Sequence, residues 1–233
     1  VQTCALPILY IPLWNKSNYT LLSSLLKIDD IISYAEENHL PSIAIADTNM
    51  FGTMEFIKKC EKKNIKPVIG LELQLEEWKI VIYAKDYYGY QSLIKLSTIQ
   101  NERKVMVKDL EQYNKNVIGI LPFDYKEQLN NLKKILKEIY LGYKNKQEEK
   151  EALILTNNVV FFQENLYRKQ EDQTTLPYLY RIRDGKTVLD EMDYDIKNHE
   201  LEKQDLNEIS SNQGIVNTLN ITEKCNLEFP KSK

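Results

Sequence analysis

Residues 40–75 read LPSIAIADTNMFGTMEFIKKCEKKNIKPVIGLELQL, and this stretch predicts a strand, a helix and a second strand in succession. The apolar run Leu40–Ala46 contains a proline-marked turn and predicts a buried strand. The polar residues Asp47–Asn49 supply capping side chains for a helix predicted at Thr53–Lys63. The run Lys66–Leu75 predicts the next strand. A unit of this length predicts two parallel strands joined by a helix on one face of a sheet.

The same alternation continues on both sides of this unit. Further strands are predicted at Leu9–Leu13, Lys79–Lys85, Asn116–Pro122, Ile139–Tyr143 and Glu151–Asn158. Further helices are predicted at Lys27–Asn38, Tyr88–Gln100 and Lys126–Glu138, and the tail Leu201–Cys225 is predicted as helices joined by polar turns. Repeated strand–helix units predict an α/β fold with a mostly parallel sheet, apart from one hairpin formed by Lys66–Leu75 and Lys79–Lys85.

The composition narrows the functional class. Of the 233 residues, 42% are hydrophobic and 28% are charged, which is typical of a folded globular protein. The formal net charge of −3 argues against a surface dedicated to coating nucleic acid. No apolar run is long enough for a membrane span, and no secretory signal is present. Three scattered cysteines without a Cys-x-x-Cys pair point to a reducing compartment and exclude a zinc knuckle.

The sequence favours a barrel over a nucleotide-binding doubly wound sheet. It has seven glycines and neither a Gly-x-Gly-x-x-Gly motif nor a Walker-type loop. In a barrel, functional residues are expected where strands end. The polar residues at predicted strand ends are Trp14–Lys16, Asp47–Asn49, Glu72 and Asn157–Asn158. Only two histidines are present, and few hydrolytic metal centres are built from so few imidazoles.

Five blocks of sequence occur in an informative order and spacing. They are residues 19–73, AKDYYGYQSLIKLS at 84–97, LILTNNVVFF at 153–162, RIRDGKTVLDE at 181–191 and ITEKCNLEF at 221–229. Together they resemble the PHP (polymerase and histidinol phosphatase) domain found at the N-terminus of bacterial DNA polymerase III alpha subunits. The similarity runs from Leu9 to the end of the chain. A composition rich in Lys, Asn, Ile and Tyr is in keeping with the subunits of low-GC Gram-positive bacteria.

The resemblance implies a distorted (β/α)7 barrel of mostly parallel strands with helices outside. It also implies that the chain is a cytoplasmic fragment of a DNA-directed DNA polymerase, whose missing core uses Mg²⁺ for nucleotidyl transfer. The implied partners are the rest of the polymerase chain, primer–template DNA, the sliding clamp and the clamp loader, with no membrane. In some family members the PHP domain is itself a metal-dependent 3′–5′ exonuclease.

The family's metal motif can be followed along this chain position by position. The active form begins with a His-x-His at the end of the first strand, and this motif falls on Trp14 and Lys16. The acidic residue and histidine of the next strand fall on Asp47 and Thr48. The acid after the next Ile-Gly pair is kept as Glu72. Lys16 therefore places a cation where the resemblance implies divalent ions, and a fixed ammonium can satisfy leftover carboxylates.

The later part of the motif is also degenerate. The Asn-Asp-x-His segment falls on Asn157–Val160, which places an amide at Asn158 and an aliphatic side chain at Val160. The last acidic–histidine region falls near Leu176 and Pro177, neither of which is a ligand. The resemblance thus implies vestigial metal-site positions at Trp14, Lys16, Asp47, Thr48, Glu72, Asn158 and Val160. We predict no catalytic residue, no bound metal and no cofactor in this part of the protein.

Three of these positions have a structural alternative. Asp47 is either left from a metal site or caps the helix at Thr53–Lys63, and we favour the cap. Glu72 is either a former ligand or a partner of Lys16, and we favour the ion pair. Trp14 either provides a platform for a ligand or fills the former cavity, and we favour filling.

The sequence predicts a division of the chain into three segments and leaves three hypotheses about its function. Residues 1–8 match the in-frame translation of a sequencing adapter and are predicted to be an artefact, residues 9–200 form the barrel, and residues 201–233 form a helical part that leads to a polymerase core. The favoured hypothesis is a non-catalytic PHP domain of a replicative polymerase. The alternatives are a stand-alone PHP phosphoesterase or 3′–5′ exonuclease, and a barrel that acts only as an interaction module.

Overall fold

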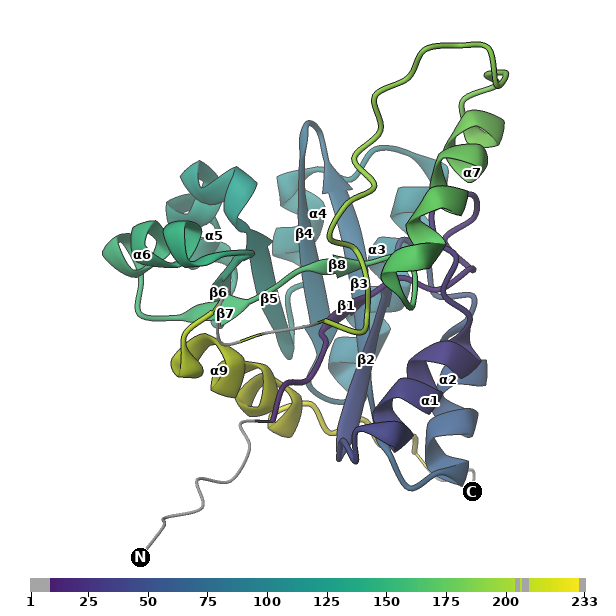
Figure 1. Cartoon of the computed structure of the whole chain (residues 1–233). Helices are drawn as coiled ribbons and strands as arrows, with labels where there is room; N and C mark the ends of the chain where they lie inside the picture. Colours follow the sequence, from purple (N-terminus) through teal and green to yellow (C-terminus); the bar gives the residue numbers. More distant parts are fainter. Residues whose placement is uncertain (1–8, 204–205, 207–209, 231–233) are drawn as a thin grey trace, which may run out of the picture.

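The computed structural model describes residues 9–203, 206 and 210–230. A six-stranded sheet with the strand order β2-β3-β4-β5-β6-β7 forms its centre (Figure 1). The strands are β2 (Ser42–Asp47), β3 (Lys66–Leu75), β4 (Trp78–Ala84), β5 (Val117–Pro122), β6 (Ile139–Tyr143) and β7 (Val159–Phe161). β2 and β3 are parallel, β4 is antiparallel to both of its neighbours, and β5, β6 and β7 are parallel. The mostly parallel sheet and the β3–β4 hairpin agree with the sequence prediction.

A second, two-stranded sheet lies between the two edges of the first. β1 (Trp14–Asn15) pairs in parallel with β8 (Glu164–Asn165), which follows β7 closely in the chain. The Asn15 side chain donates a hydrogen bond to the main-chain oxygen of Ala44 in β2. The small sheet therefore links β2 on one side to the β7 end on the other, and the fold is a distorted barrel, as predicted.

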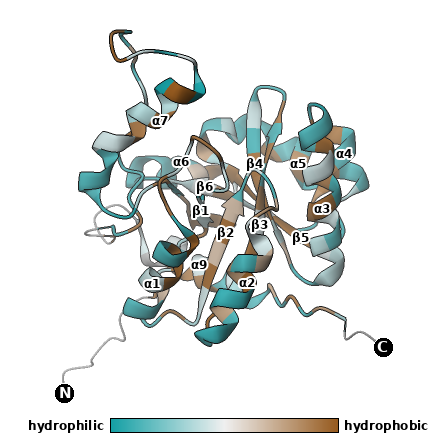
Figure 2. Ribbon diagram, turned by 90° about the vertical axis from the view of Figure 1, so that its right-hand side faces the viewer, coloured by the Kyte–Doolittle hydropathy of each residue, from teal (hydrophilic) through white to brown (hydrophobic). Residues whose placement is uncertain are grey.

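Helices cover the outside of this barrel. They include α1 (Ile28–Glu37), α2 (Thr53–Lys62), α3 (Tyr87–Glu102), α4 (Val107–Gln112), α5 (Leu129–Ile135) and α6 (Lys146–Leu155). The amphipathic helices α1 and α2 turn most of their apolar residues inward, as in α1, where Ile28, Ile31, Ile32 and Ala35 are buried. Figure 2 shows the hydrophobic strands at the centre and hydrophilic residues on the outer faces of the helices. This arrangement leaves the carboxyl ends of the parallel strands free of the main helical layer.

The opposite end of the barrel is closed by α9 (Asn212–Glu223). Asn217 donates a hydrogen bond to the main-chain oxygen of Val159, the first residue of β7. Ser42, the first residue of β2, donates its hydroxyl hydrogen to Thr222 at 2.9 Å. Thr218 accepts from the main-chain nitrogen of Ile11. These contacts fix the amino ends of β2 and β7, and the carboxyl ends of these strands lie at the other end of the barrel.

The predicted strand at Leu9–Leu13 is wrong. Ile11 and Leu13 are buried, but their main-chain groups bond to side chains: Ile11 donates to Thr218, and Leu13 accepts from the Tyr83 hydroxyl at 2.9 Å. Pro12 has no N–H to donate to a neighbouring strand. The segment is therefore buried without strand pairing, and the first strand begins only at Trp14.

The predicted strand at Glu151–Asn158 is also wrong, because most of it belongs to α6. The Asn145 side chain accepts hydrogen bonds from the main-chain nitrogens of Gln147 and Glu148, which starts the helix at Lys146. The apolar residues that suggested a strand end the helix instead, and Ile154 is 84% exposed. The strand that follows, β7, starts at Val159.

One part of the chain projects from the barrel. After the 3₁₀ turn Gln170–Thr175, α7 (Leu176–Arg183) and the loop that follows it extend away from the strands (Figures 1 and 2). Leu176 and Tyr180 pack with Leu166 and Tyr167 in a small separate core. Within the described ranges, no helix is long and apolar enough to cross a membrane. The predicted artefact, residues 1–8, lies outside the described residues.

Candidate functional site

The candidate site begins with the two-residue alternation in β1. Side chains at positions i and i+2 of a strand share one face, so Trp14 and Lys16 point to the same side, while Asn15 points to the other. Asn15 is fixed there by hydrogen bonds to Ala44 and to the side chain of Asn165. Trp14 pairs in register with Glu164 of β8, which places the Glu164 side chain beside Lys16.

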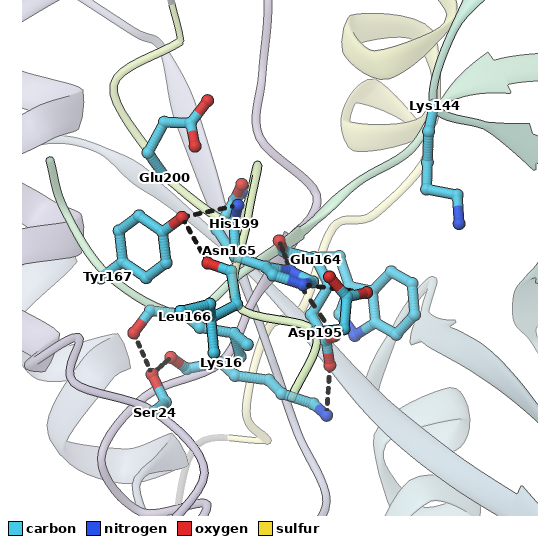
Figure 3. Close-up of polar contacts among 12 residues, drawn as sticks. Lys16, Ser24, Lys144, Glu164, Asn165, Leu166, Tyr167, Asp195, His199 and Glu200 are labelled. Atoms are coloured by element: carbon cyan, nitrogen blue, oxygen red, sulfur yellow. Dashed lines mark hydrogen bonds and ion pairs between the residues drawn. The ribbon is translucent and has the colours of Figure 1, made fainter. Parts of the chain in front are cut away.

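An ion cluster forms around the Lys16 ammonium. Lys16 Nζ lies 2.8 Å from Glu72 Oε2 and 2.5 Å from Glu164 Oε1. Figure 3 shows the Lys16 side chain reaching toward Glu164 beneath the segment that carries His199. Lys16 is 6% exposed and Glu72 is 5% exposed, so the pair is buried. The ion pair between Lys16 and Glu72 that we favoured from the sequence is present, with Glu164 as a second anion.

Trp14 completes the cluster. Its Nε1 donates a hydrogen bond of 2.9 Å to Glu72 Oε2, the oxygen that also faces Lys16. Its ring stacks on Phe162 with a centroid distance of 4.8 Å, and Lys79 Nζ lies 4.8 Å from the ring centroid. Lys79 also lies 3.9 Å from Glu72 and 3.7 Å from Glu164. Trp14 is therefore buried between an aromatic ring and a cation, in accordance with a filling role.

The charges of this cluster stabilise one another. Burial alone would lower the pKa of Lys16, but the Glu72 and Glu164 carboxylates raise it above its ordinary value. Burial alone would raise the pKa of Glu164, and the nearby Lys16 and Lys79 ammoniums bring it below its ordinary value. Both groups are consequently charged at neutral pH. The ammonium of Lys16, which is part of the chain, therefore already occupies the position between the two carboxylates.

The donor set does not fit a divalent metal. An ammonium lies within hydrogen-bond distance of both Glu72 and Glu164, at the place where a metal would have to bind them. In the part of the chain that the structure describes, no group of three or more His, Cys, Asp or Glu side chains is arranged to hold a metal ion. The chemistry that the geometry supports is therefore ion pairing within the protein rather than metal-assisted hydrolysis.

Asp47 does not cap a helix, contrary to our expectation. α2 begins at Thr53 with Gly52 at its N-cap and no capping side chain. Asp47 instead accepts hydrogen bonds from the main-chain nitrogen and hydroxyl of Ser17 at 2.6 and 2.7 Å, and from the Thr20 hydroxyl at 2.8 Å. Its carboxylate thus fixes the loop after β1, which holds Lys16 in place.

Asp47 gives a pH-dependent prediction. Burial raises the pKa of Asp47 to about 6, although its hydrogen bonds to Ser17 and Thr20 oppose the shift. Because the unfolded carboxyl ionises near pH 4, the contribution of Asp47 to stability is greatest below that pH and falls as the pH rises through about 6. We expect Asp47→Asn to remove about 3 kcal/mol of this dependence.

Denaturant unfolding of both proteins from pH 4 to pH 7 measures this difference. The wild-type protein should lose stability relative to Asp47→Asn as the pH rises through this range. Two parallel pH profiles would contradict the assigned environment of Asp47.

The other predicted positions lie apart from the cluster. Thr48 contributes main-chain atoms only, accepting a hydrogen bond from the Gln100 side chain at 2.8 Å. Asn158 precedes β7, and its side chain lies 3.4 Å from the main-chain oxygen of Ile139, at the start of β6. Val160 is fully buried within β7. Asn158 is therefore at the amino end of these strands, and the structure does not bring it or Val160 to the cluster.

Leu176 and Pro177 likewise take no part in the ion cluster. Leu176 is buried in the small core under α7, and Pro177 lies in the first turn of that helix, where its missing N–H has no cost. They start a projecting helix and contribute no polar group.

Sequence reasoning missed Glu164, Lys79 and His199. His199 Nδ1 lies 2.9 Å from the main-chain oxygen of Glu164 and 3.8 Å from its carboxylate. The signal for Glu164 was its position just beyond the buried apolar run Val159–Phe162, because β7 ends within this run. For Lys79 the signal was the hairpin, since a residue diagonal to Glu72 shares its face of the sheet.

A cavity of about 680 Å³ adjoins the cluster. Trp14, Phe162 and Glu164 form part of its wall, and the segment Asp195–Lys203 covers one side. This segment, which we name the strap, is tied down by hydrogen bonds from the main-chain nitrogen of Leu166 to His199 and from Lys203 to Asn165. Burial lowers the pKa of Lys203 to about 8.

The chain is similar to one protein family and to several bacterial DNA polymerase subunits. The PHP domain family matches residues 13–168. DNA polymerase III subunit alpha of Ureaplasma parvum is 42% identical over 95 residues, which cover 40% of this chain and 10% of that protein. The same subunit of Mycoplasma genitalium is 28% identical over 212 residues, which cover 89% of this chain and 22% of that protein. The subunit of Staphylococcus epidermidis is 29% identical over 235 residues, which cover 91% of this chain and 21% of that protein. The chain thus spans about a fifth of the relatives that it matches along most of its length.

Proposed function

The chain belongs to the PHP domain family, and from this we propose that it is the PHP portion of a DNA polymerase III alpha-type protein. The observation that carries the proposal is the similarity to two such subunits over 89% and 91% of the chain. A stand-alone phosphoesterase has less support, because the matches to these subunits cover 89% and 91% of the chain and so extend beyond the PHP match at residues 13–168.

The activity of the whole protein would be template-directed DNA synthesis, with Mg²⁺ at a polymerase core outside these residues. Its partners would be primer–template DNA and the replication proteins of the bacterial cytoplasm, including the sliding clamp and the clamp loader. The sizes of the related subunits support this, since each is several times longer than the matched region.

Within that protein we assign this domain a structural role. Hydrolysis of a phosphodiester by a metal site requires carboxylates and imidazoles that are free to bind divalent ions. Glu72 and Glu164 are instead neutralised by Lys16, and the position before Asn15 carries the indole of Trp14. These replacements support a domain that folds and connects rather than one that cleaves DNA.

Three measurements test the proposal. We expect the purified 233-residue chain to contain no stoichiometric metal by elemental analysis and to show no Mn²⁺- or Zn²⁺-dependent release of nucleotides from single-stranded DNA. The full-length protein encoded by the gene should extend a primer on a DNA template. Nuclease activity that disappears in Glu72→Gln would overturn the structural role, and a full-length protein without DNA synthesis would overturn the polymerase assignment.

A further inference from the structure

The cluster around Lys16 is neutral in charge although it is buried. Two carboxylates, Glu72 and Glu164, face two ammoniums, Lys16 and Lys79. One divalent ion would neutralise the same two carboxylates. Because two buried carboxylates without a cation would repel each other, this part of the fold requires positive charge at this position.

Lys16 holds the central position among these charges. Its Nζ lies within 2.8 Å of oxygens on two different carboxylates, whereas Lys79 Nζ lies 3.7 to 3.9 Å from them. The side chain of Lys16 is 8% exposed and that of Lys79 is 24% exposed. Lys16 is therefore the bridging cation, and Lys79 adds charge from the solvent side.

The bridge joins segments that the main sheet does not hold together. Lys16 follows β1, Glu72 lies in β3 and Glu164 lies in β8, and these strands are not consecutive in either sheet apart from β1 and β8. The main-chain oxygen of Glu164 also accepts a hydrogen bond of 2.9 Å from Nδ1 of His199 in the strap. The cation consequently fixes both the strand ends and the residue on which the strap rests.

We propose that the Lys16 ammonium is a covalently attached replacement for a divalent cation, and that it makes closure of this end of the barrel independent of metal. The proposal concerns the stability of the fold and does not depend on polymerase activity. It has a direct consequence. When the ammonium is removed, Glu72 and Glu164 become a pair of buried carboxylates that an oxygen-binding divalent ion stabilises.

Thermal unfolding of four proteins tests this, each measured with EDTA and with millimolar Mn²⁺. The wild-type melting temperature should be the same in both. Lys16→Ala should melt about 10 °C lower in EDTA, and Mn²⁺ should restore at least half of that loss. The double variant Lys16→Ala/Glu72→Gln removes one charge of each sign and should show no Mn²⁺ effect. Lys79→Ala, the matched lysine control, should also show none.

Other outcomes would overturn the proposal. A wild-type protein that is destabilised by EDTA would show that a metal is already required. A Lys16→Ala protein whose melting temperature ignores Mn²⁺ would show that the ammonium acts through packing or hydrogen bonding alone. If Lys16→Ala fails to fold with Mn²⁺ present while the double variant folds, the two carboxylates prevent folding and a divalent ion does not neutralise them, so replacement of the ammonium by a divalent ion is excluded.

Discussion

Trp14→Ala should lower the free energy of unfolding by about 3–5 kcal/mol, the range for truncating a buried aromatic side chain. The ring is 4% exposed and stacks on Phe162, so its removal leaves a cavity beside the ion cluster. It also removes the indole N–H that donates to Glu72 and the face on which Lys79 lies. The loss combines apolar packing, a buried hydrogen bond and a cation–π contact.

Chemical denaturation followed by far-ultraviolet circular dichroism measures this effect without relying on tryptophan fluorescence. Trp14→Phe keeps an aromatic ring against Phe162 but has no N–H for Glu72, and it should cost about 1–2 kcal/mol. Tyr88→Ala, which truncates an aromatic ring that is 66% exposed, should change stability by less than about 0.5 kcal/mol. A Trp14→Ala protein as stable as Tyr88→Ala would contradict the buried position of the indole.

The alternation of strands and helices could be predicted from the sequence because the apolar periodicity follows it closely in most elements. The central unit is the clearest case: strands at Ser42–Asp47 and Lys66–Leu75 flank a helix at Thr53–Lys62. The wrong strand predictions occurred where an apolar run was buried or helical without being paired as a strand. Leu153–Leu155 is as apolar as a strand, but the Asn145 cap upstream had already started a helix that continues through it.

The site could be predicted only where contacts depend on short sequence spacing. Trp14 and Lys16 share a face because they lie two residues apart in the extended segment formed by β1 and the residue after it, and both contact Glu72. Glu164 is 148 residues from Lys16, and its role depends on the pairing of β1 with β8, which periodicity does not encode. Asp47 was assigned to the nearest helix, whereas its true partners are the donors of the loop after β1.

The cluster stabilises the end of the barrel at which the resemblance predicted a degenerate metal motif. It combines an ammonium between two carboxylates, an indole N–H on one of their oxygens and an aromatic stack beside the indole. These contacts are mutually dependent, because Trp14 and Lys16 both bind Glu72 Oε2. Removal of Glu72 should therefore affect more of the site than removal of any peripheral charge.

We accordingly expect Glu72→Ala to lower the free energy of unfolding by about 3–5 kcal/mol, as found when one partner of a buried ion pair is removed. The substitution leaves Lys16 with Glu164 as its close carboxylate and leaves the Trp14 N–H without its acceptor. Glu72→Gln keeps an oxygen that can accept from Trp14 or Lys16, and its loss should be smaller, about 1–3 kcal/mol.

The matched control is Glu151→Ala, which breaks the exposed pair of Glu151 with Lys126. Solvent screens that pair, so its loss should be less than about 1 kcal/mol. Equilibrium unfolding in urea at neutral pH compares the three variants with the wild-type protein. If Glu72→Ala loses no more stability than Glu151→Ala, the carboxylate is not a buried partner of Lys16. If Glu72→Ala and Glu72→Gln lose the same amount, charge rather than hydrogen bonding accounts for the whole effect, since the remaining oxygen then adds nothing.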